Sequence, residues 1–301
     1  MSGLTRPATV PELAWIAAPA VRAQLVEDPA ELAGIAGAEP WRVRVTEKGE
    51  AALLARWREH LDFCAVLGLW CSPLRVPVLV TDLLEVARAE GFGRLLGPLV
   101  PEGSSRPYLE AGLRVAERVV VMRLDLRPRA RALAGAPAPA PAEADAGGTA
   151  ARATRVPGLT VSEAGADELD GILDVDEACF DPFWRYDRAG LERLARAGRL
   201  AVGRLEGRVV GYTLATCRAG DGSLGRLAVV PGARRRGVGR AMADDAVDWI
   251  ASQGCRSAVL STQVDNTASR SLYHAMGFAE TGDVLVACAS GTLVREAGEG
   301  R

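Results

Sequence analysis

The spacing of apolar residues predicts both helices and strands in the first half of the chain. Residues 10–38 are rich in Ala with scattered larger apolar side chains, which predicts one or two helices broken near Pro29. Residues 41–45 alternate apolar and polar positions, as a half-buried strand does. Closely spaced apolar runs at 51–57 and 61–71 then indicate an antiparallel meander. Three further segments follow, namely an apolar run at 76–80, a helix near 82–91 and a last strand at 114–126.

The second half of the chain shows the same mixture of periods. Helical spacing recurs at 166–179 and at 187–197, where Asp187 is placed to cap the helix. Glu206-Gly207 lies between two apolar runs and predicts a hairpin turn. Strands are expected at 159–161, 199–205, 208–217, 227–230, 257–262 and 278–289, with further helices from 238 and at 266–276.

A segment rich in Pro and Ala separates the two halves. The chain of 301 residues exceeds the usual length of one domain. Residues 136–142 alternate Ala and Pro, which sustain neither helix nor sheet, so an extended conformation is expected there. The sequence therefore predicts a first domain at 1–127, a flexible linker at 128–157, a second domain at 158–290 and a disordered tail at 291–301.

One stretch joins a predicted strand to a predicted helix through a basic, glycine-rich loop. The apolar run 227–230 stops at Pro231, and three arginines and the glycines of 237–239 precede the helix. The first turn of a helix has unpaired N–H groups and the positive end of the helix dipole, and both attract anions. Glycines let a phosphate approach the backbone, so residues 234–240 are expected to bind a phosphate-bearing ligand. Forked donors come from Arg234, Arg235, Arg236 and Arg240.

Composition narrows the class of protein. The chain is 49% hydrophobic and 25% charged with a formal net charge of −2, which gives no general attraction for nucleic acid or membranes. The six cysteines form no Cys-x-x-Cys pair and the two histidines stand far apart, so no metal site is expected. The start of the chain lacks the pattern of a signal peptide, and a cytoplasmic location is expected.

Two common nucleotide-binding motifs do not fit the glycine-rich loop. The loop lacks the Gly-Lys-Ser/Thr ending of a P-loop NTPase. It also follows a meander in the second half of its domain, whereas a Rossmann loop belongs to a leading βαβ unit. A second motif decides the question, because residues 264–278, Val-Asp-Asn-Thr-Ala-Ser-Arg-Ser-Leu-Tyr-His-Ala-Met-Gly-Phe, follow a strand and open a short helix.

Together, Arg234-x-x-Gly-x-Gly and this second motif resemble the acetyl-CoA-binding half of the GNAT family of N-acetyltransferases. The family pattern continues with an Asn, a Tyr seven residues later and a closing Gly-Phe, and Asn266, Tyr273 and Gly277-Phe278 stand at matching spacing. The resemblance covers residues 158–290. It implies an α/β (α+β) fold with a mixed, mostly antiparallel sheet flanked by helices, and acetyl-CoA as the acetyl donor.

The resemblance also implies roles for particular residues. The loop 234–240 would hold the CoA pyrophosphate, and the end of the preceding strand would pair with the pantetheine arm. Asn266 would contact that arm, or it only caps its helix. Tyr273 would protonate the departing thiolate, because a phenol with a pKa near 10 keeps its proton at neutral pH. The implied cofactor set is Leu227, Ala228, Val229, Arg234, Arg235, Arg236, Gly237, Val238, Gly239, Arg240 and Asn266.

The general base and the acceptor site are less constrained. Relatives that acetylate protein N-termini often carry a Glu five residues before the Asn, where this chain has Ser261. Asp221, or a water chain past Gln263 and Thr262, could replace that base. In the family, the connection between the first two helices covers the amine site. Four aromatic residues there either line the acceptor site or only pack the helices, namely Phe180, Phe183, Trp184 and Tyr186.

The first half resembles a GNAT domain that lacks the phosphate loop. Tyr108, Gly112 and Leu113 repeat the Tyr, Gly and Phe spacing of the second half, but residues 76–91 hold no Arg-x-x-Gly-x-Gly and Pro101 stands where the Asn would be. This indicates a tandem GNAT chain with one working site, as in mycothiol synthase-like enzymes. An unrelated α/β module remains the alternative.

The pattern predicts an N-acetyltransferase that moves the acetyl group of acetyl-CoA to a primary amine by direct nucleophilic attack. The alternative is a non-catalytic acyl-CoA-binding or regulatory module. The expected acceptor is a small molecule or a peptide, and neither nucleic acid nor a membrane is an expected partner. The chain is expected to be a monomer or a homodimer.

Overall fold

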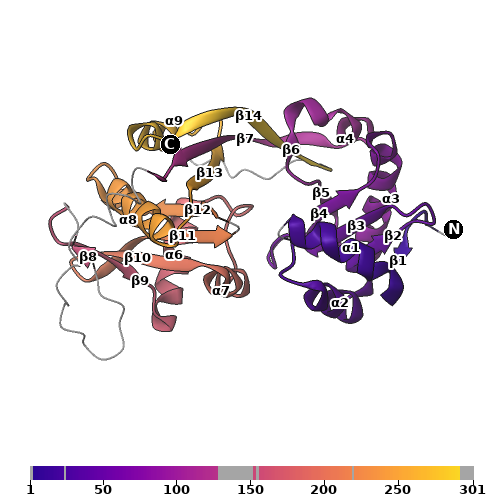
Figure 1. The fold of residues 1–301 in the computed structure, drawn as a ribbon, viewed down its shortest axis with the longest axis horizontal. Coiled ribbons are helices and arrows are strands. Elements are labelled where there is room, and N and C mark those ends of the chain that lie inside the picture. Colours follow the sequence, from indigo (N-terminus) through magenta and orange to yellow (C-terminus); the bar gives the residue numbers. More distant parts are fainter. Residues whose placement is uncertain (1–2, 24, 128–151, 154–155, 219, 292–301) are drawn as a thin grey trace. The chain divides into compact units, whose positions relative to one another are not determined.

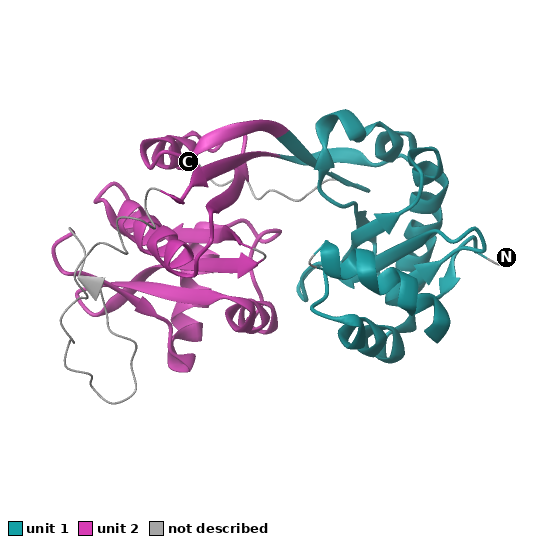
Figure 2. Ribbon diagram, viewed as in Figure 1, with its two compact units in different colours: residues 1–118, 284–294 teal, residues 119–283, 295–301 magenta. Residues whose placement is uncertain are grey.

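The computed structural model describes residues 3–23, 25–127, 152–153, 156–218 and 220–291 (Figure 1). Contacts divide the chain into two compact units, residues 1–118 with 284–294 (unit 1) and residues 119–283 with 295–301 (unit 2), as Figure 2 shows. Strand β7 (Arg114–Asp125) begins in unit 1 and ends in unit 2, whereas β14 (Ala279–Ala289) begins in unit 2 and ends in unit 1. Most of the expected linker at 128–157 and of the expected tail at 291–301 lies outside the described residues, and the four expected domain limits stay a prediction.

Unit 1 carries its helices on both faces of a sheet. The helices are α1 (Val10–Arg22), α2 (Pro29–Ala38), α3 (Val76–Ala89) and α4 (Arg106–Glu110), with 3-10 turns at Pro40–Arg42, Pro73–Arg75 and Glu102–Ser104. The strands are β1 (Arg6–Pro7), β2 (Val43–Val45), β3 (Ala51–Arg56), β4 (Phe63–Trp70), β5 (Arg94–Leu96) and β6 (Val100–Pro101). Their order is β1-β2-β3-β4-β5-β14, with β6 also beside β14. Strands β4 and β5 are parallel because α3 connects them.

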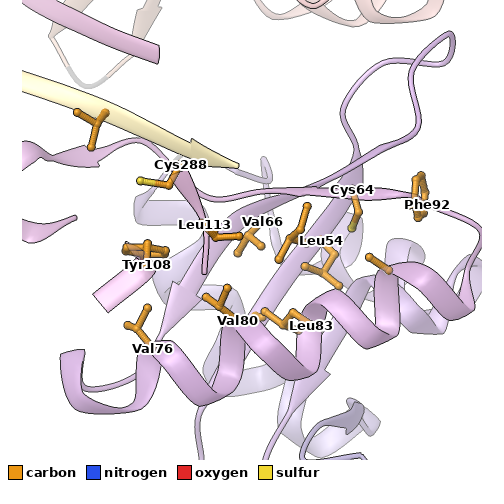
Figure 3. Packing of buried hydrophobic residues seen from close by; sticks show 14 residues of the cluster. Leu54, Cys64, Val66, Val76, Val80, Leu83, Phe92, Tyr108, Leu113 and Cys288 are labelled. Atoms are coloured by element: carbon orange, nitrogen blue, oxygen red, sulfur yellow. The ribbon is translucent and has the colours of Figure 1, made fainter. Parts of the chain in front are cut away.

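Helix α3 begins earlier than the sequence pattern predicts. Residues 76–80 belong to this helix, and Pro77 lies in its first turn, where a missing N–H costs no helical hydrogen bond. Its apolar side chains, among them Val80 and Leu83, pack on those of β3 and β4, as Figure 3 shows. The expected break near Pro29 is confirmed, since α2 begins there.

Unit 2 has the same layered arrangement. Its strands are β8 (Arg152–Ala153), β9 (Leu159–Glu163), β10 (Arg199–Leu205), β11 (Arg208–Arg218), β12 (Asp221–Val229), β13 (Ser257–Gln263) and residues 119–125 of β7. Its helices are α6 (Leu169–Cys179), α7 (Arg188–Ala197), α8 (Val238–Ser252) and α9 (Thr267–Ala275), with 3-10 turns at Ala166–Glu168 and Pro231–Ala233. The strand order is β8-β9-β10-β11-β12-β13-β7, and β12 and β13 are the parallel pair that α8 connects. The mixed, mostly antiparallel α/β fold expected from the sequence is therefore confirmed.

Local signals in unit 2 act as the sequence predicts. Asp187 caps α7, because its carboxylate accepts a hydrogen bond of 2.6 Å from the Gly190 N–H. Glu206 and Gly207 both have positive φ angles, 53° and 79°, which suits a tight hairpin between β10 and β11. Helices α6 and α7 cover one face of the sheet, and α8 covers the other. No helix of the described residues is long and apolar enough to cross a membrane.

Candidate functional site

Strand β12 leaves its parallel neighbour β13 after a short stretch of pairing. The two strands pair only from Asp221 opposite Ser257 to Ser223 opposite Val259. Leu224 and residues 226–229 of β12 therefore pair with β11 on one side and have no partner strand in β13 on the other. A β-bulge at Gly225, which has no partner in β11, accompanies this separation.

The register shows which backbone groups face the open edge of β12. The Val230 N–H donates to the Val210 carbonyl at 2.9 Å, so Val230 belongs to a hydrogen-bonded pair with β11. In an antiparallel ladder such pairs alternate, so Ala228 also bonds to β11, and Leu227 and Val229 direct their N–H and C=O groups to the open edge. The side chain of Ala228 is only 3% exposed and packs in the core.

The open edge leads to the N-terminus of α8. Among the residues that the structure describes, no side chain caps this helix, and its N-cap, Gly237, has a φ of 82°, which favours glycine. A Cβ added to Gly239 would meet only ordinary contacts, 3.7 Å from Val229 and 3.8 Å from Leu272. Packing within the protein therefore does not require glycine at 239, whereas close approach of a ligand would. Val238 is buried and anchors the turn on the sheet.

The four arginines of this loop differ in their contacts. Arg234 donates through Nε to the Val229 carbonyl at 2.9 Å, and Arg240 donates to the Asp244 carboxylate at 2.7 Å. Arg235 and Arg236 are exposed and have no side-chain partner among the described residues. Arg235 also has a φ of 61°, a strained conformation for a residue with a side chain. The two outward arginines are thus available to an anion at the helix N-terminus.

The second motif forms helix α9. Asn266 is the N-cap, and its side-chain oxygen accepts a hydrogen bond of 3.1 Å from the Ser269 N–H. Helix α9 ends at Ala275; Gly277, just after the C-cap Met276, has a φ of 92°, and the Phe278 N–H returns to the Tyr273 carbonyl at 3.0 Å. His274 lies near the Phe278 carbonyl and the Glu280 carboxylate, which gives it a structural role.

Tyr273 is held in the interior of unit 2. It is 7% exposed, and its ring meets that of Phe278 edge-on with the centroids 5.7 Å apart. Burial raises the pKa of Tyr273 to about 12, because the charged phenolate is disfavoured away from water. Its hydroxyl has no hydrogen-bond partner among the described residues, and the hydroxyl oxygen is not fully buried. The hydroxyl oxygen therefore keeps a small exposed surface.

The aromatic residues between α6 and α7 surround Arg226 of β12. The Arg226 guanidinium lies 4.0 Å from the ring centroid of Phe180 and 4.1 Å from that of Tyr186, and it donates to the Trp184 carbonyl at 2.5 Å. Phe183 is buried and meets the Trp184 ring edge-on at 5.0 Å. The sequence motifs do not include Arg226. The signal that could have identified it is a charged residue within an apolar strand.

The candidate bases differ in exposure and partners. Ser261 lies exposed on β13, in register with Val121. Asp221 accepts hydrogen bonds from the Ser257 hydroxyl at 2.6 Å and from Arg123 at 2.8 Å. These groups hold the pKa of Asp221 below its usual range, which makes its carboxylate a weaker base.

Unit 1 has a turn like the one that follows α9, but it lacks a counterpart of the candidate anion site at the start of α8. The Leu113 N–H bonds the Tyr108 carbonyl at 3.1 Å, as Phe278 bonds Tyr273, and Gly112 has a φ of 86°. At the start of α3, however, Pro77 lacks an N–H, and Arg75 is paired with the mostly buried carboxylate of Glu50 at 2.8 Å. An anion at this helix would therefore lack one backbone donor, and the guanidinium of Arg75 is already paired.

Comparison with known proteins places the central part of unit 2 beside a family of acetyltransferases. Residues 169–278, from α6 to the end of the second motif, match the family model described as "Acetyltransferase (GNAT) family". This part of the chain therefore matches the GNAT acetyltransferase family, and the resemblance drawn from the two motifs is confirmed there. Over 56 residues it is 45% identical to aminoglycoside N(6′)-acetyltransferase type 1 of Klebsiella aerogenes, a match that spans 19% of this chain and 37% of that protein.

Solved structures show the same fold over most of the chain. A GCN5-related N-acetyltransferase from Sphaerobacter thermophilus has a TM-score of 0.60 at 17% identity, covering 95% of this chain and 94% of that one. A tandem GNAT protein from the clavulanic acid biosynthesis pathway has a TM-score of 0.58 at 17% identity, covering 83% and 82%. Within the described residues, no three His, Cys, Asp or Glu side chains gather as a metal site requires.

Proposed function

We propose that unit 2 binds acetyl-CoA and transfers its acetyl group to a primary amine. One observation on the described residues carries this proposal, namely that the unpaired edge of β12 leads through the turn Pro231–Ala233 to a helix N-terminus that none of their side chains caps. A ligand with an extended amide arm joined to a diphosphate has groups that complement both features. An anion site alone would need only the helix terminus.

Residues of this chain can be assigned to the parts of such a ligand. The backbone of Leu227 and Val229 would pair with the amides of the pantetheine arm, and Arg234 would give up the Val229 carbonyl to it. The N–H groups at the start of α8, with Arg235 and Arg236, would hold the diphosphate. Asn266 caps α9 and would contact the arm through its remaining amide group.

Tyr273 would supply the proton that the reaction needs at sulfur. When bound, acetyl-CoA provides the thioester that an amine attacks directly. The raised pKa keeps the Tyr273 hydroxyl protonated at neutral pH, so this group can donate to the departing thiolate. Ser261 is too weak a base to deprotonate an ammonium group, so the amine would lose its proton to water or arrive neutral.

Two measurements on the full chain test the proposal. Acetyl-CoA should raise the thermal unfolding temperature, and titration calorimetry should give one molecule per chain, because α3 lacks the donors of α8. Thiol release should then follow the addition of an amine from a panel of amino acids, peptide N-termini, polyamines and aminoglycosides, the last suggested by the Klebsiella relative. Stabilisation without thiol release on any amine would favour the non-catalytic acyl-CoA-binding module. Absence of both effects would refute the proposal.

A further inference from the structure

We infer that Arg226 is a positioning residue that fixes the aromatic segment 180–186 as a rigid wall of the acceptor site. The inference rests on the proposed function, because only an acetyltransferase has an amine acceptor to position. Arg226 itself is 10% exposed in its side chain, so it is an internal support of the wall.

The contacts of Arg226 hold both ends of this segment. Phe180 begins it and Tyr186 closes it, and both rings cover the guanidinium at close to 4 Å. Between them, the Trp184 carbonyl accepts a hydrogen bond from Arg226. A single side chain of β12 therefore holds three points of a segment that has no regular structure of its own.

Asp176 of α6 completes this support. Its side chain is 1% exposed, and one carboxylate oxygen lies 3.6 Å from Arg226 Nε. The same carboxylate accepts hydrogen bonds from the Tyr212 hydroxyl and, at 2.7 Å, from the Tyr186 N–H. The buried charge of Arg226 is thus balanced by a carboxylate that also ties down the end of the segment.

The position of Arg226 along β12 connects the aromatic segment 180–186 with the candidate acyl-donor site. Arg226 directly precedes Leu227, the first of the two residues whose backbone faces the open edge. The strand that would hold the acyl donor therefore also sets the position of the aromatic segment. Because a lysine has neither the planar fork nor the stacking surface of an arginine, it should not replace Arg226 here.

Hydrogen exchange and kinetics on the full chain test the inference with Arg226→Lys. The Tyr186 amide should exchange at least tenfold faster, and the KM for the best amine of the panel should rise at least tenfold. The Kd for acetyl-CoA should stay within twofold. Arg188→Lys is the matched control, because Arg188 begins α7 with a mostly exposed ion pair to Asp170. A second variant, Tyr186→Leu, removes one stacked ring and leaves the buried charges paired, so it should reproduce the rise in amine KM.

The outcomes separate this inference from the proposed function. Unchanged exchange of the Tyr186 amide in Arg226→Lys overturns it, as does faster exchange with an unchanged amine KM. An equal loss of acetyl-CoA affinity also overturns it, because the effect would then be a general disturbance of β12. If the wild-type chain acetylates no amine, the proposed function fails and the acceptor role fails with it. The exchange data then still decide whether Arg226 orders the segment.

Discussion

Asp245 of α8 and Arg199 of β10 form a nearly buried ion pair, with 2.6 Å between the Asp245 carboxylate and the Arg199 guanidinium. Their side chains are 9% and 12% exposed. The pair joins the helix that begins at the candidate phosphate site to the sheet beneath it. Close packing also holds α8 against the sheet. Cβ atoms on Gly203 and Gly211 would come within 3 Å of the Met242 sulfur of α8, so only glycine leaves room for this side chain. The position of α8 is therefore set by close packing and by charge.

Loss of either charge of this pair should destabilise unit 2. Asp245→Ala leaves Arg199 buried without its partner and should lower the free energy of unfolding by about 3 kcal/mol. Chemical denaturation followed by circular dichroism measures this change. The double variant Arg199→Met, Asp245→Leu should recover most of the loss, because neither charge then remains buried. A double variant no more stable than Asp245→Ala would contradict this explanation.

Tyr273→Phe should lower turnover about 100-fold, the usual range for removing a general acid, while the Kd for acetyl-CoA stays unchanged. The reason is that the ring continues to pack against Phe278 and only the proton donor is lost. Steady-state thiol release and calorimetry measure the two quantities. His274→Gln is the control, since its contacts with Phe278 and Glu280 are structural and its turnover should match the wild type. Equal turnover of Tyr273→Phe and wild type would exclude Tyr273 as the acid.

Most elements of this fold follow from local patterns, and the exceptions have physical causes. The run at 76–80 is apolar and β-branched, which suits a strand, but Pro77 tolerates only the first turn of a helix and the side chains face β3 and β4. Two strands divided between the units cannot be predicted by local periodicity, because residues 119–125 pair with β13, more than 130 positions away.

In the candidate site, too, local sequence patterns predict only those residues that stand close together in the chain. The glycines, the arginines and the Asn-Tyr pair could be identified because their spacing within one motif is characteristic. Arg226 could not, because its partners Asp176, Phe180 and Tyr186 lie 40 to 50 positions earlier in the sequence and meet it only in the fold. The motif likewise does not show that Arg236 points outward while Arg240 is paired with Asp244, because Asp244 lies outside the motif.

Alkaline conditions should destabilise the wild type more than Tyr273→Phe. The pKa of Tyr273 is raised by burial from 10.0 to about 12 in the folded state. Below pH 10 the phenol is protonated in both states, whereas between pH 10 and 12 only the unfolded state loses the proton. The free energy of unfolding therefore falls across this window, by up to about 3 kcal/mol for a shift of two units. Urea unfolding from pH 9 to pH 12 measures the slope, which should be shallower in the Phe variant. Parallel slopes in the two proteins would contradict the raised pKa.

Arg236→Gln should weaken acetyl-CoA binding about tenfold at low salt, because the diphosphate would lose its bond to an outward guanidinium that has no partner among the described residues. The difference from wild type should shrink as salt is added, since the charge is exposed to screening. Acetyl-pantetheine, which lacks the diphosphate, should bind both proteins equally. Arg208→Gln, an exposed arginine at the start of β11, is the matched control and should leave both affinities unchanged. Calorimetry at two salt concentrations decides, and an equal loss of acetyl-pantetheine affinity in Arg236→Gln would place the effect elsewhere than at the phosphates.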